Sequence, residues 1–364
     1  MERALQELAE AQGKIGHEVY VITSKYGASD RPVTEILNGV RIFRVNAWRL
    51  YHPVLTVPKN LPENALRKAD IVHVHSHLSL FSMKVLSWAS NRDVNTACYF
   101  MAVDAFRNHP NWFMRFFASY YDEKNIRRAL FLADLRLVKN LRDKKILREK
   151  YGVETEYLPD AIPESYFTIE RRDPTGFLEK YGIRQDKFFL FIGRMHRLKG
   201  PHVLVKALKH LGNDIATVFI GPDDGFLRET LKLASKLGIK DRVYVLGYVS
   251  EKDKIWAIDS AIALVLPSIS EHVEAYSIVI SEAWAREKPV IGSRVGVIPY
   301  RIKHGMNGLL VNPSDPKALA EAMIKLASDK ELATEMGKQG KTSVLSWNDV
   351  ALKSIELYEH AIGQ

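Results

Sequence analysis

The sequence contains almost no cysteine and no long hydrophobic run. Cys98 is the one cysteine among 364 residues, which excludes an internal disulfide and is usual for proteins of a reducing compartment. No apolar run approaches the roughly 20 residues that span a bilayer, and the charged Glu2 and Arg3 follow Met1 where a signal peptide would begin its apolar stretch. We therefore expect a cytoplasmic protein whose contact with a membrane, where there is one, is peripheral.

Acidic residues are scarce in one basic and aromatic segment. The net charge of the chain is +9, and residues 107–150 hold 12 Lys and Arg against 5 Asp and Glu. The stretch Pro110–Tyr121 adds aromatic residues around Arg115. This combination indicates an anionic membrane or a lipid-linked molecule as partner, and the alternative is a helix that buries one aromatic face. It also suits single-stranded nucleic acid, but no nucleic-acid motif accompanies it, so we expect no such partner.

Strand-like apolar runs alternate with helical patterns along most of the chain. Several runs, such as Phe188–Ile192, are continuously apolar, which is typical of parallel strands covered on both faces. The alternation predicts an α/β fold of two doubly wound, Rossmann-like domains facing a cleft. A turn-rich connector near Pro163–Pro174 divides an N-terminal domain, 1–168, from a C-terminal domain, 169–346. A terminal helix, 347–364, can pack back on the N-terminal domain.

The N-terminal domain opens in an unusual way. A doubly wound domain normally begins with a strand and a glycine-rich turn. This chain begins with the amphipathic pattern Glu2–Gln12 and reaches its first predicted strand at Val19. Either the usual first strand is missing from the sequence, or the domain is built without it.

Two glutamates lie around the start of one predicted helix. Glu274 lies in the loop that follows a strand ending at Leu266, and Glu282 lies within the helix, for which Ser277 is the predicted N-cap. The free N–H groups of a helix N-terminus bind anions, and open α/β sheets bind ligands at this edge. One carboxylate can therefore accept hydrogen bonds from sugar hydroxyls and the other from ribose hydroxyls, with a diphosphate between them. On spacing alone, two solvated glutamates are the alternative.

A basic loop follows another predicted strand. That strand ends at Ile192, Gly193 permits a tight turn, and Arg194 and Lys199 follow at the same edge of the sheet. Two fixed cations there can neutralise a diphosphate and stabilise it as it departs. A solvated basic loop is the alternative for this segment taken alone.

Three motifs in the C-terminal half resemble, in order, those of the retaining glycosyltransferases of family 4, which have the GT-B fold. They are G-R-x4-K-G from Gly193 to Gly200, the Glu-x7-Glu segment from Glu274 to Glu282, and P-V-I-x-S-x-x-G-G, which here reads Pro289 to Val297 with Val297 in place of the last glycine. Each motif is weak alone, and their combination in this order is specific.

The resemblance implies transfer of a hexosyl group from a UDP- or GDP-sugar to a hydroxyl acceptor that is lipid-linked or a polysaccharide. It implies retention of configuration and no metal ion or other cofactor. The catalytic residues would be Glu274, Arg194 and Lys199. The donor would be bound by residues from four segments: Arg194, Lys199, Gly247, Tyr248, Glu274, Tyr276, Ser277, Ile278 and Glu282. In these roles Arg194 and Lys199 grip the diphosphate, Glu274 lies beside the sugar, Glu282 holds the ribose, and Gly247 and Tyr248 contact the base.

The N-terminal half matches the family pattern less closely. Asp70–His75 resembles its D-V-V-H-x-H strand, and His75 and Asp104 are the candidates for the acceptor side. The place of the family's usual histidine is taken by Ala102 and that of a usual serine by Lys139, while the first strand would lie upstream of Met1, as in a truncated sequence. A second interpretation is therefore a catalytically impaired GT-B protein that binds nucleotide sugar and acts as a partner or regulator.

Three histidines, His73, His75 and His77, invite comparison with a metal site. Alternation along a strand puts His73 and His75 on one face, and His77 falls in the following loop. A metal ion would need a further ligand that the sequence does not supply, so we expect no metal here.

Overall fold

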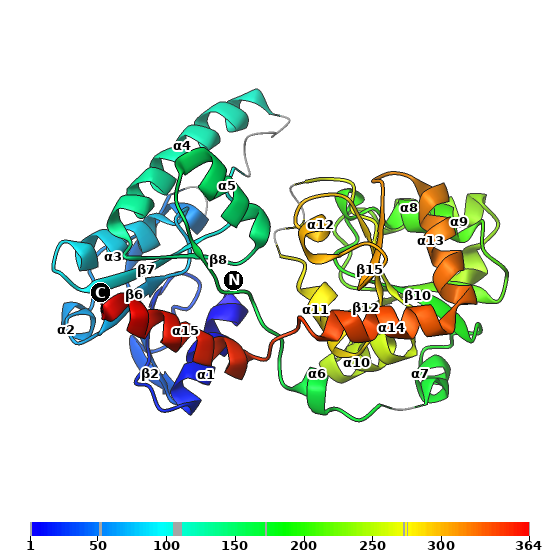
Figure 1. Cartoon of the computed structure of the whole chain (residues 1–364), viewed down its shortest axis with the longest axis horizontal. Coiled ribbons are helices and arrows are strands. Elements are labelled where there is room, and N and C mark those ends of the chain that lie inside the picture. The colour runs from blue at the N-terminus through cyan, green and yellow to red at the C-terminus, as the bar shows by residue number, and fades with distance from the viewer. Residues whose placement is uncertain are drawn as a thin grey trace. The chain divides into compact units, whose positions relative to one another are not determined.

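The computed structural model describes residues 2–50, 53–104, 111–171, 173–271, 274 and 276–363. The chain divides into two compact units (Figure 1). Unit 1 comprises Met1–Ala161 and Leu345–Gln364, and unit 2 comprises Ile162–Val344. The C-terminal helix thus belongs to unit 1.

Unit 2 is built on one sheet of six parallel strands. Their order is β12-β11-β10-β13-β14-β15. The strands are β10 (Lys187–Ile192), β11 (Ile215–Ile220), β12 (Val243–Gly247), β13 (Leu264–Leu266), β14 (Val290–Ser293) and β15 (Gly308–Val311). Counted along the chain this is the order 3-2-1-4-5-6, in which the direction of winding reverses between β10 and β13. The predicted doubly wound fold is confirmed, and the reversal marks the edge where such sheets bind ligands.

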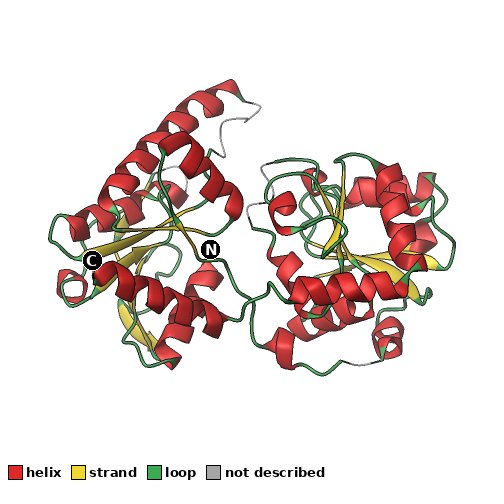
Figure 2. Cartoon of the chain, in the orientation of Figure 1, coloured by secondary structure: helices red, strands yellow, loops and turns green. Residues whose placement is uncertain are grey.

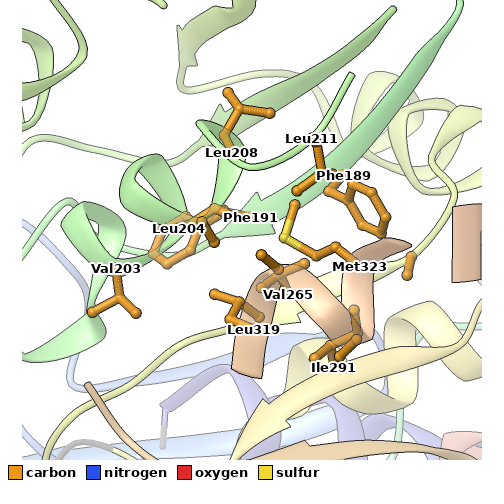
Figure 3. Packing of buried hydrophobic residues seen from close by; sticks show 14 of the residues in the cluster. Phe189, Phe191, Val203, Leu204, Leu208, Leu211, Val265, Ile291, Leu319 and Met323 are labelled. Atoms are coloured by element: carbon orange, nitrogen blue, oxygen red, sulfur yellow. The ribbon is translucent and has the colours of Figure 1, made fainter. Parts of the chain in front are cut away.

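Helices cover both faces of this sheet (Figure 2). They are α6 (Ser165–Thr168), α7 (Pro174–Lys180), α8 (Pro201–Leu208), α9 (Leu227–Lys236), α10 (Glu251–Ser260), α11 (Ile278–Ala285), α12 (Ile298–Arg301), α13 (Pro316–Ser328) and α14 (Lys330–Lys341). Successive strand residues point to opposite faces, so Phe189 and Phe191 of β10 join one core with Leu204 and Met323 (Figure 3). Phe188 and Leu190 of the same strand join the other. A strand buried on both faces explains why its sequence is continuously apolar.

Unit 1 contains three sheets, of order β1-β3-β2, β4-β5 and β6-β7-β8-β9. Their strands are β1 (Tyr20–Ser24), β2 (Thr34–Leu37), β3 (Val40–Val45), β4 (Ala47–Arg49), β5 (Thr56–Pro58), β6 (Ile71–Val74), β7 (Asn95–Phe100), β8 (Leu135–Val138) and β9 (Glu156–Tyr157). The helices are α1 (Glu2–Lys14), α2 (Glu63–Leu66), α3 (Leu80–Ser90), α4 (Trp112–Leu132), α5 (Leu141–Tyr151) and α15 (Trp347–Ile362). Strand β1 begins one residue after the predicted Val19, and β6 lies within the predicted strand Asp70–His75. The sequence analysis did not predict β2, β4, β5 or β9, which are short and lack a continuous apolar run.

Helix α15 packs on α1 and on the sheet of β7 and β8. The amide of Gln12 donates to Ser354 Oγ over 2.8 Å, and Tyr358 Oη lies 2.6 Å from His73 Nδ1. A capping box of Ser346 and Asp349 starts the helix.

Helix α14 approaches α11 so closely that two glycines are required. A Cβ added to Gly337 would lie 1.9 Å from the carbonyl oxygen of Glu287, and one added to Gly340 would lie 2.1 Å from Cδ1 of Trp284. Neither the backbone carbonyl nor the buried indole can move away cheaply. This packing fixes the helix that carries Glu282.

We predict that Gly337→Ala lowers the free energy of unfolding by about 1–3 kcal/mol, because the added methyl overpacks the contact. Urea unfolding followed by circular dichroism measures the change. Gly176→Ala in α7 is the matched control, since no atom lies within 4 Å of its added Cβ. There alanine's better helix propensity should leave stability unchanged or slightly raised. Equal stability of the two variants would contradict the packing argument.

Candidate functional site

The loops after β10 and β13 lie against each other at the point where the winding reverses. The N–H of Ile269 donates to the carbonyl oxygen of Leu198 over 2.9 Å. Gly200 adopts a φ of +73°, and a Cβ there would lie 1.9 Å from the carbonyl oxygen of Pro267. The glycine that ends the G-R-x4-K-G motif is thus required both by its backbone conformation and by this close approach.

Glu274 forms the centre of the site. Its side chain is 2% exposed, and Lys199 Nζ lies 2.8 Å from its Oε1. Ser268 Oγ donates to the same oxygen over 2.5 Å, while the hydroxyl of Ser277 donates to Oε2. A carboxylate this deeply buried is stable only with a cation and hydrogen-bond donors around it. Glu274 and the basic loop, which the sequence analysis placed at the same edge of the sheet, are in direct contact.

The start of α11 differs in one detail from the prediction. Ser277 occupies the N-cap position, but it has a φ of +57° and its side chain makes no capping hydrogen bond. Its hydroxyl serves Glu274 instead. The N–H of Ile280 donates to the carbonyl oxygen of Ser277 over 3.0 Å. The N–H groups of Ile278 and Val279 precede it at the N-terminus of α11, where a helix can bind an anion.

Arg301 holds the backbone just before α11 by hydrogen bonds, and the sequence analysis did not predict this role. Its Nη1 donates to the carbonyl oxygens of Tyr276 and Ser277 over 3.1 and 2.9 Å. Its Nη2 donates to Ser281 Oγ over 2.6 Å, and its guanidinium lies 4.5 Å from the centroid of the Tyr276 ring. No local signal in the sequence marks Arg301, because its partners lie 20 or more residues away.

Arg194 makes a different contact from Lys199. Its Nη1 lies 2.5 Å from Oδ2 of Asp224, an exposed pair in which Asp224 comes from the loop after β11. Exposed ion pairs contribute little to stability, so Arg194 can exchange Asp224 for another anion at small cost. The two cations of the motif thus lie on one loop, the loop after β10, and are held by carboxylates of two other loops, Lys199 by Glu274 and Arg194 by Asp224.

Glu282 is buried in α11 and paired with a lysine that the sequence analysis also missed. Lys254 Nζ of α10 lies 2.9 Å from Glu282 Oε1 and 3.2 Å from Glu251 Oε1. Oε2 of Glu282 and the hydroxyl of Tyr166 are both buried, with no hydrogen-bond partner among the described residues. Burial, and then the charge of Glu282, raises the pKa of Tyr166. One oxygen of Glu282 is therefore neutralised and the other is left to accept a hydrogen bond.

Gly247 ends β12 and Tyr248 follows it, at the same carboxyl edge of the parallel sheet. The carbonyl oxygen of Gly247 accepts a hydrogen bond from the N–H of Gly221 over 2.8 Å, and Gly247 has a φ of +66°. Tyr248 is 92% exposed. An aromatic side chain held out at this edge can stack on a flat ligand group.

The predicted acceptor-side residues lie in unit 1 with separate partners. The ring of His75 stacks on that of His73, with centroids 4.3 Å apart, and burial, followed by His73 and Lys139, lowers the pKa of His75. Asp104 instead pairs with Lys150, whose Nζ lies 2.8 Å from its Oδ1. No contact joins His75 to Asp104 in the part of the chain that the structure describes.

The strand ends around these residues carry further buried charges. Lys139 Nζ lies 2.5 Å from Asp160 Oδ1. Ala102, in the place of the family's usual histidine, has a φ of +54° and donates its N–H to Asp143 Oδ2 over 2.8 Å. His77 is paired with Asp122 over 2.8 Å, apart from the stacked His73 and His75. Within the described ranges, no group of three or more His, Cys, Asp or Glu side chains could hold a metal ion.

Comparison with known proteins gives a consistent result for both units. A family model described as Glycosyltransferase Family 4 matches residues 1–159, and one described as Glycosyl transferases group 1 matches residues 177–343. The chain is 26% identical over 378 residues to an uncharacterized glycosyltransferase of Methanocaldococcus jannaschii, covering 98% of this chain and 93% of that protein. It is 25% identical over 394 residues to a D-inositol 3-phosphate glycosyltransferase of Xylanimonas cellulosilytica, covering 98% and 90%.

Solved structures show the same fold. A sucrose-phosphate synthase from Thermosynechococcus elongatus aligns with a TM-score of 0.74 at 21% identity, covering 99% of this chain and 92% of that one. The Anabaena protein HepE, solved in complex with UDP, aligns with a TM-score of 0.77 at 15% identity, covering 99% and 96%. Both likenesses confirm the predicted GT-B fold.

The two family models cover nearly the whole chain, and the motif residues of unit 2 meet where the sheet reverses its winding. The chain belongs to the glycosyltransferases of family 4, and it is an enzyme that uses a nucleotide sugar.

Proposed function

We propose that this enzyme transfers a hexosyl group from a UDP- or GDP-sugar to a hydroxyl acceptor, lipid-linked or a polysaccharide, with retention of configuration. Transfer takes place at the cytoplasmic face of a membrane or in the cytoplasm. The donor is bound by unit 2. UDP is the first candidate because HepE, which shares this fold, was solved in complex with it.

The observation that carries the proposal is the contact of Lys199 with the buried Glu274 beside the start of α11. A diphosphate bound at the first-turn N–H groups of α11, around Ser277 and Ile278, would lie next to the ammonium group of Lys199. Arg194 would leave Asp224 to bind the same diphosphate. As the bond from the sugar to the diphosphate breaks, negative charge builds on the leaving oxygen, and these groups stabilise it. No metal ion enters the proposal, because the two cations and the helix end supply the positive charge.

Glu274 and Glu282 take different parts in holding the donor. Glu274, oriented by Ser268 and Ser277, would accept hydrogen bonds from hydroxyls of the sugar. Glu282 would accept one from a ribose hydroxyl through its unpartnered Oε2, while Lys254 neutralises its other oxygen.

The remaining donor contacts are proposed from position on the sheet edge. Tyr248 and the backbone of Gly247 would contact the base. Tyr276, held under Arg301, would line the same site. On the acceptor side, His75 and Asp104 are proposed to face the acceptor.

We predict that Lys199→Ala lowers the rate of sugar release from the donor by about 10²–10³-fold, because one fixed cation is lost from the departing diphosphate. Glu274→Gln should lower it as strongly, and Arg194→Ala by about tenfold or more. The rate is measured as UDP formed from UDP-glucose, with melting temperature recorded to exclude unfolding.

Lys187→Ala is the matched control for Lys199→Ala. Lys187 begins the strand whose end leads to Lys199, and it forms an exposed pair with Asp214 over 3.3 Å. It should keep the wild-type rate. A Lys199→Ala variant that is folded and as active as Lys187→Ala would refute the assignment of the site. Unchanged UDP binding with no transfer by the wild type to any of a panel of acceptors would favour the non-catalytic alternative.

A second prediction concerns the ribose. Removing one ribose hydroxyl from UDP should weaken binding to the wild type by about 10–100-fold, because a buried charged oxygen of Glu282 then stays without a partner. Calorimetry with UDP and its 2′-deoxy and 3′-deoxy analogues measures the ratio of the dissociation constants of each analogue and of UDP. In Glu282→Gln the ratio should shrink to a few-fold.

Glu251→Gln serves as control for the ribose experiment. Glu251 also contacts Lys254, but it is not proposed to contact the donor. The variant should therefore retain the wild-type ratio. If Glu251→Gln and Glu282→Gln change the ratio equally, the role given to Glu282 is wrong.

A further inference from the structure

Helix α4 in unit 1 has one ordinary buried face. Ile126 and Ala129 belong to the core with Leu86 of α3 and Phe100 of β7. Asp122 is also buried and accepts hydrogen bonds from His77 Nε2 and the N–H of Asp104. This face fixes the helix against unit 1.

The other side of α4 is aromatic where a solvated helix would be polar. Five side chains are between 51% and 87% exposed: Trp112, Phe116, Phe117, Tyr120 and Phe131. Trp112, Phe116 and Tyr120 recur every four residues and so follow one side of the helix. Phe116 and Phe117 pack edge to face, with ring centroids 5.2 Å apart. Single exposed apolar residues are common, but a set of this size on one helix marks an interaction surface.

Basic side chains share this exposed side. Arg115, Lys124, Arg127 and Arg128 are all exposed. The acidic residues of the described helix are Asp122, which is buried, and Glu123, which pairs with Arg127 over 2.8 Å. The surface is therefore aromatic and positively charged, and we call these nine residues the α4 surface.

The chemistry of the α4 surface favours an anionic bilayer over a second copy of the chain. Aromatic rings settle at the level of lipid headgroups, and Lys and Arg are attracted to anionic headgroups. In a symmetric dimer the same patch would face itself, so its cations would repel one another. In Figure 1, α4 runs along one side of unit 1 and its first turns extend beyond the neighbouring helices.

We propose that the α4 surface docks this enzyme on a bilayer that contains anionic lipid. This inference deepens the proposed function, because it favours the lipid-linked acceptor over the polysaccharide, and it rests on that function only for the nature of the acceptor. No helix among the described residues is long and apolar enough to cross a membrane. Docking therefore takes place at the headgroup level, by the aromatic and basic side chains together. Residues 107–110 of the predicted basic segment lie outside the described residues.

Vesicle flotation tests the proposal with the full chain. The wild type should float with phosphatidylcholine vesicles that contain about 30% phosphatidylglycerol, and binding should fall by about tenfold or more with pure phosphatidylcholine or in high salt. Trp112→Ala with Phe116→Ala and Tyr120→Ala, and separately Arg127→Gln with Arg128→Gln, should each lower binding by about tenfold or more. Trp48→Ala is the control, since Trp48 is an exposed tryptophan of β4 in the same unit.

Donor hydrolysis in the absence of vesicles separates this proposal from the proposed function. The α4 variants should hydrolyse UDP-glucose in solution at the wild-type rate, because they leave unit 2 intact. Wild-type binding to vesicles by the α4 variants, or equal binding to neutral and anionic vesicles, would overturn the docking proposal. A concentration-dependent dimer in light scattering that the aromatic variant abolishes would also overturn it, in favour of a second copy.

Discussion

The donor site depends on a carboxylate that is buried at the end of a sheet. Its burial is possible because Lys199, Ser268 and Ser277 satisfy both oxygens of Glu274. These partners come from three segments, so the charge of one side chain ties together the loops after β10 and β13 and the start of α11. Gly200 permits that closeness, and Arg301 holds the backbone just before the helix. The burial of Glu274 thus orders these loops and also places the ammonium group of Lys199 beside the N-terminus of α11.

Much of this arrangement could be predicted because the signals are local or topological. A continuous apolar run such as Phe188–Ile192 is what a strand buried on two faces requires, and parallel strands bring all their carboxyl ends to one edge. Lys199 and Glu274 follow two strands that flank the reversal of winding, so their meeting follows from topology. The short strands β2, β4, β5 and β9 were not predictable in this way, because none has an apolar run to mark it.

The contacts that the sequence did not reveal join residues with no pattern between them. Nothing in the sequence distinguishes Lys254 from other lysines, because its contact with Glu282 arises only from the packing of α10 beside α11. Arg194 forms an ion pair with Asp224, which lies on a different loop. The hydroxyl of Ser277 donates to Glu274 instead of capping α11. In each case the partner depends on how separate loops and helices pack together, and the spacing of residues along the sequence does not reveal that packing.

The central claim is that Lys199 acts on the diphosphate of the donor. Calorimetry of UDP and of uridine with the wild type and Lys199→Met tests it most directly, since the two ligands differ only in the group that Lys199 is proposed to hold. The account predicts that Lys199→Met weakens UDP binding by about tenfold or more and leaves uridine binding unchanged. An equal loss for both ligands, or no loss for UDP in a folded variant, would contradict it.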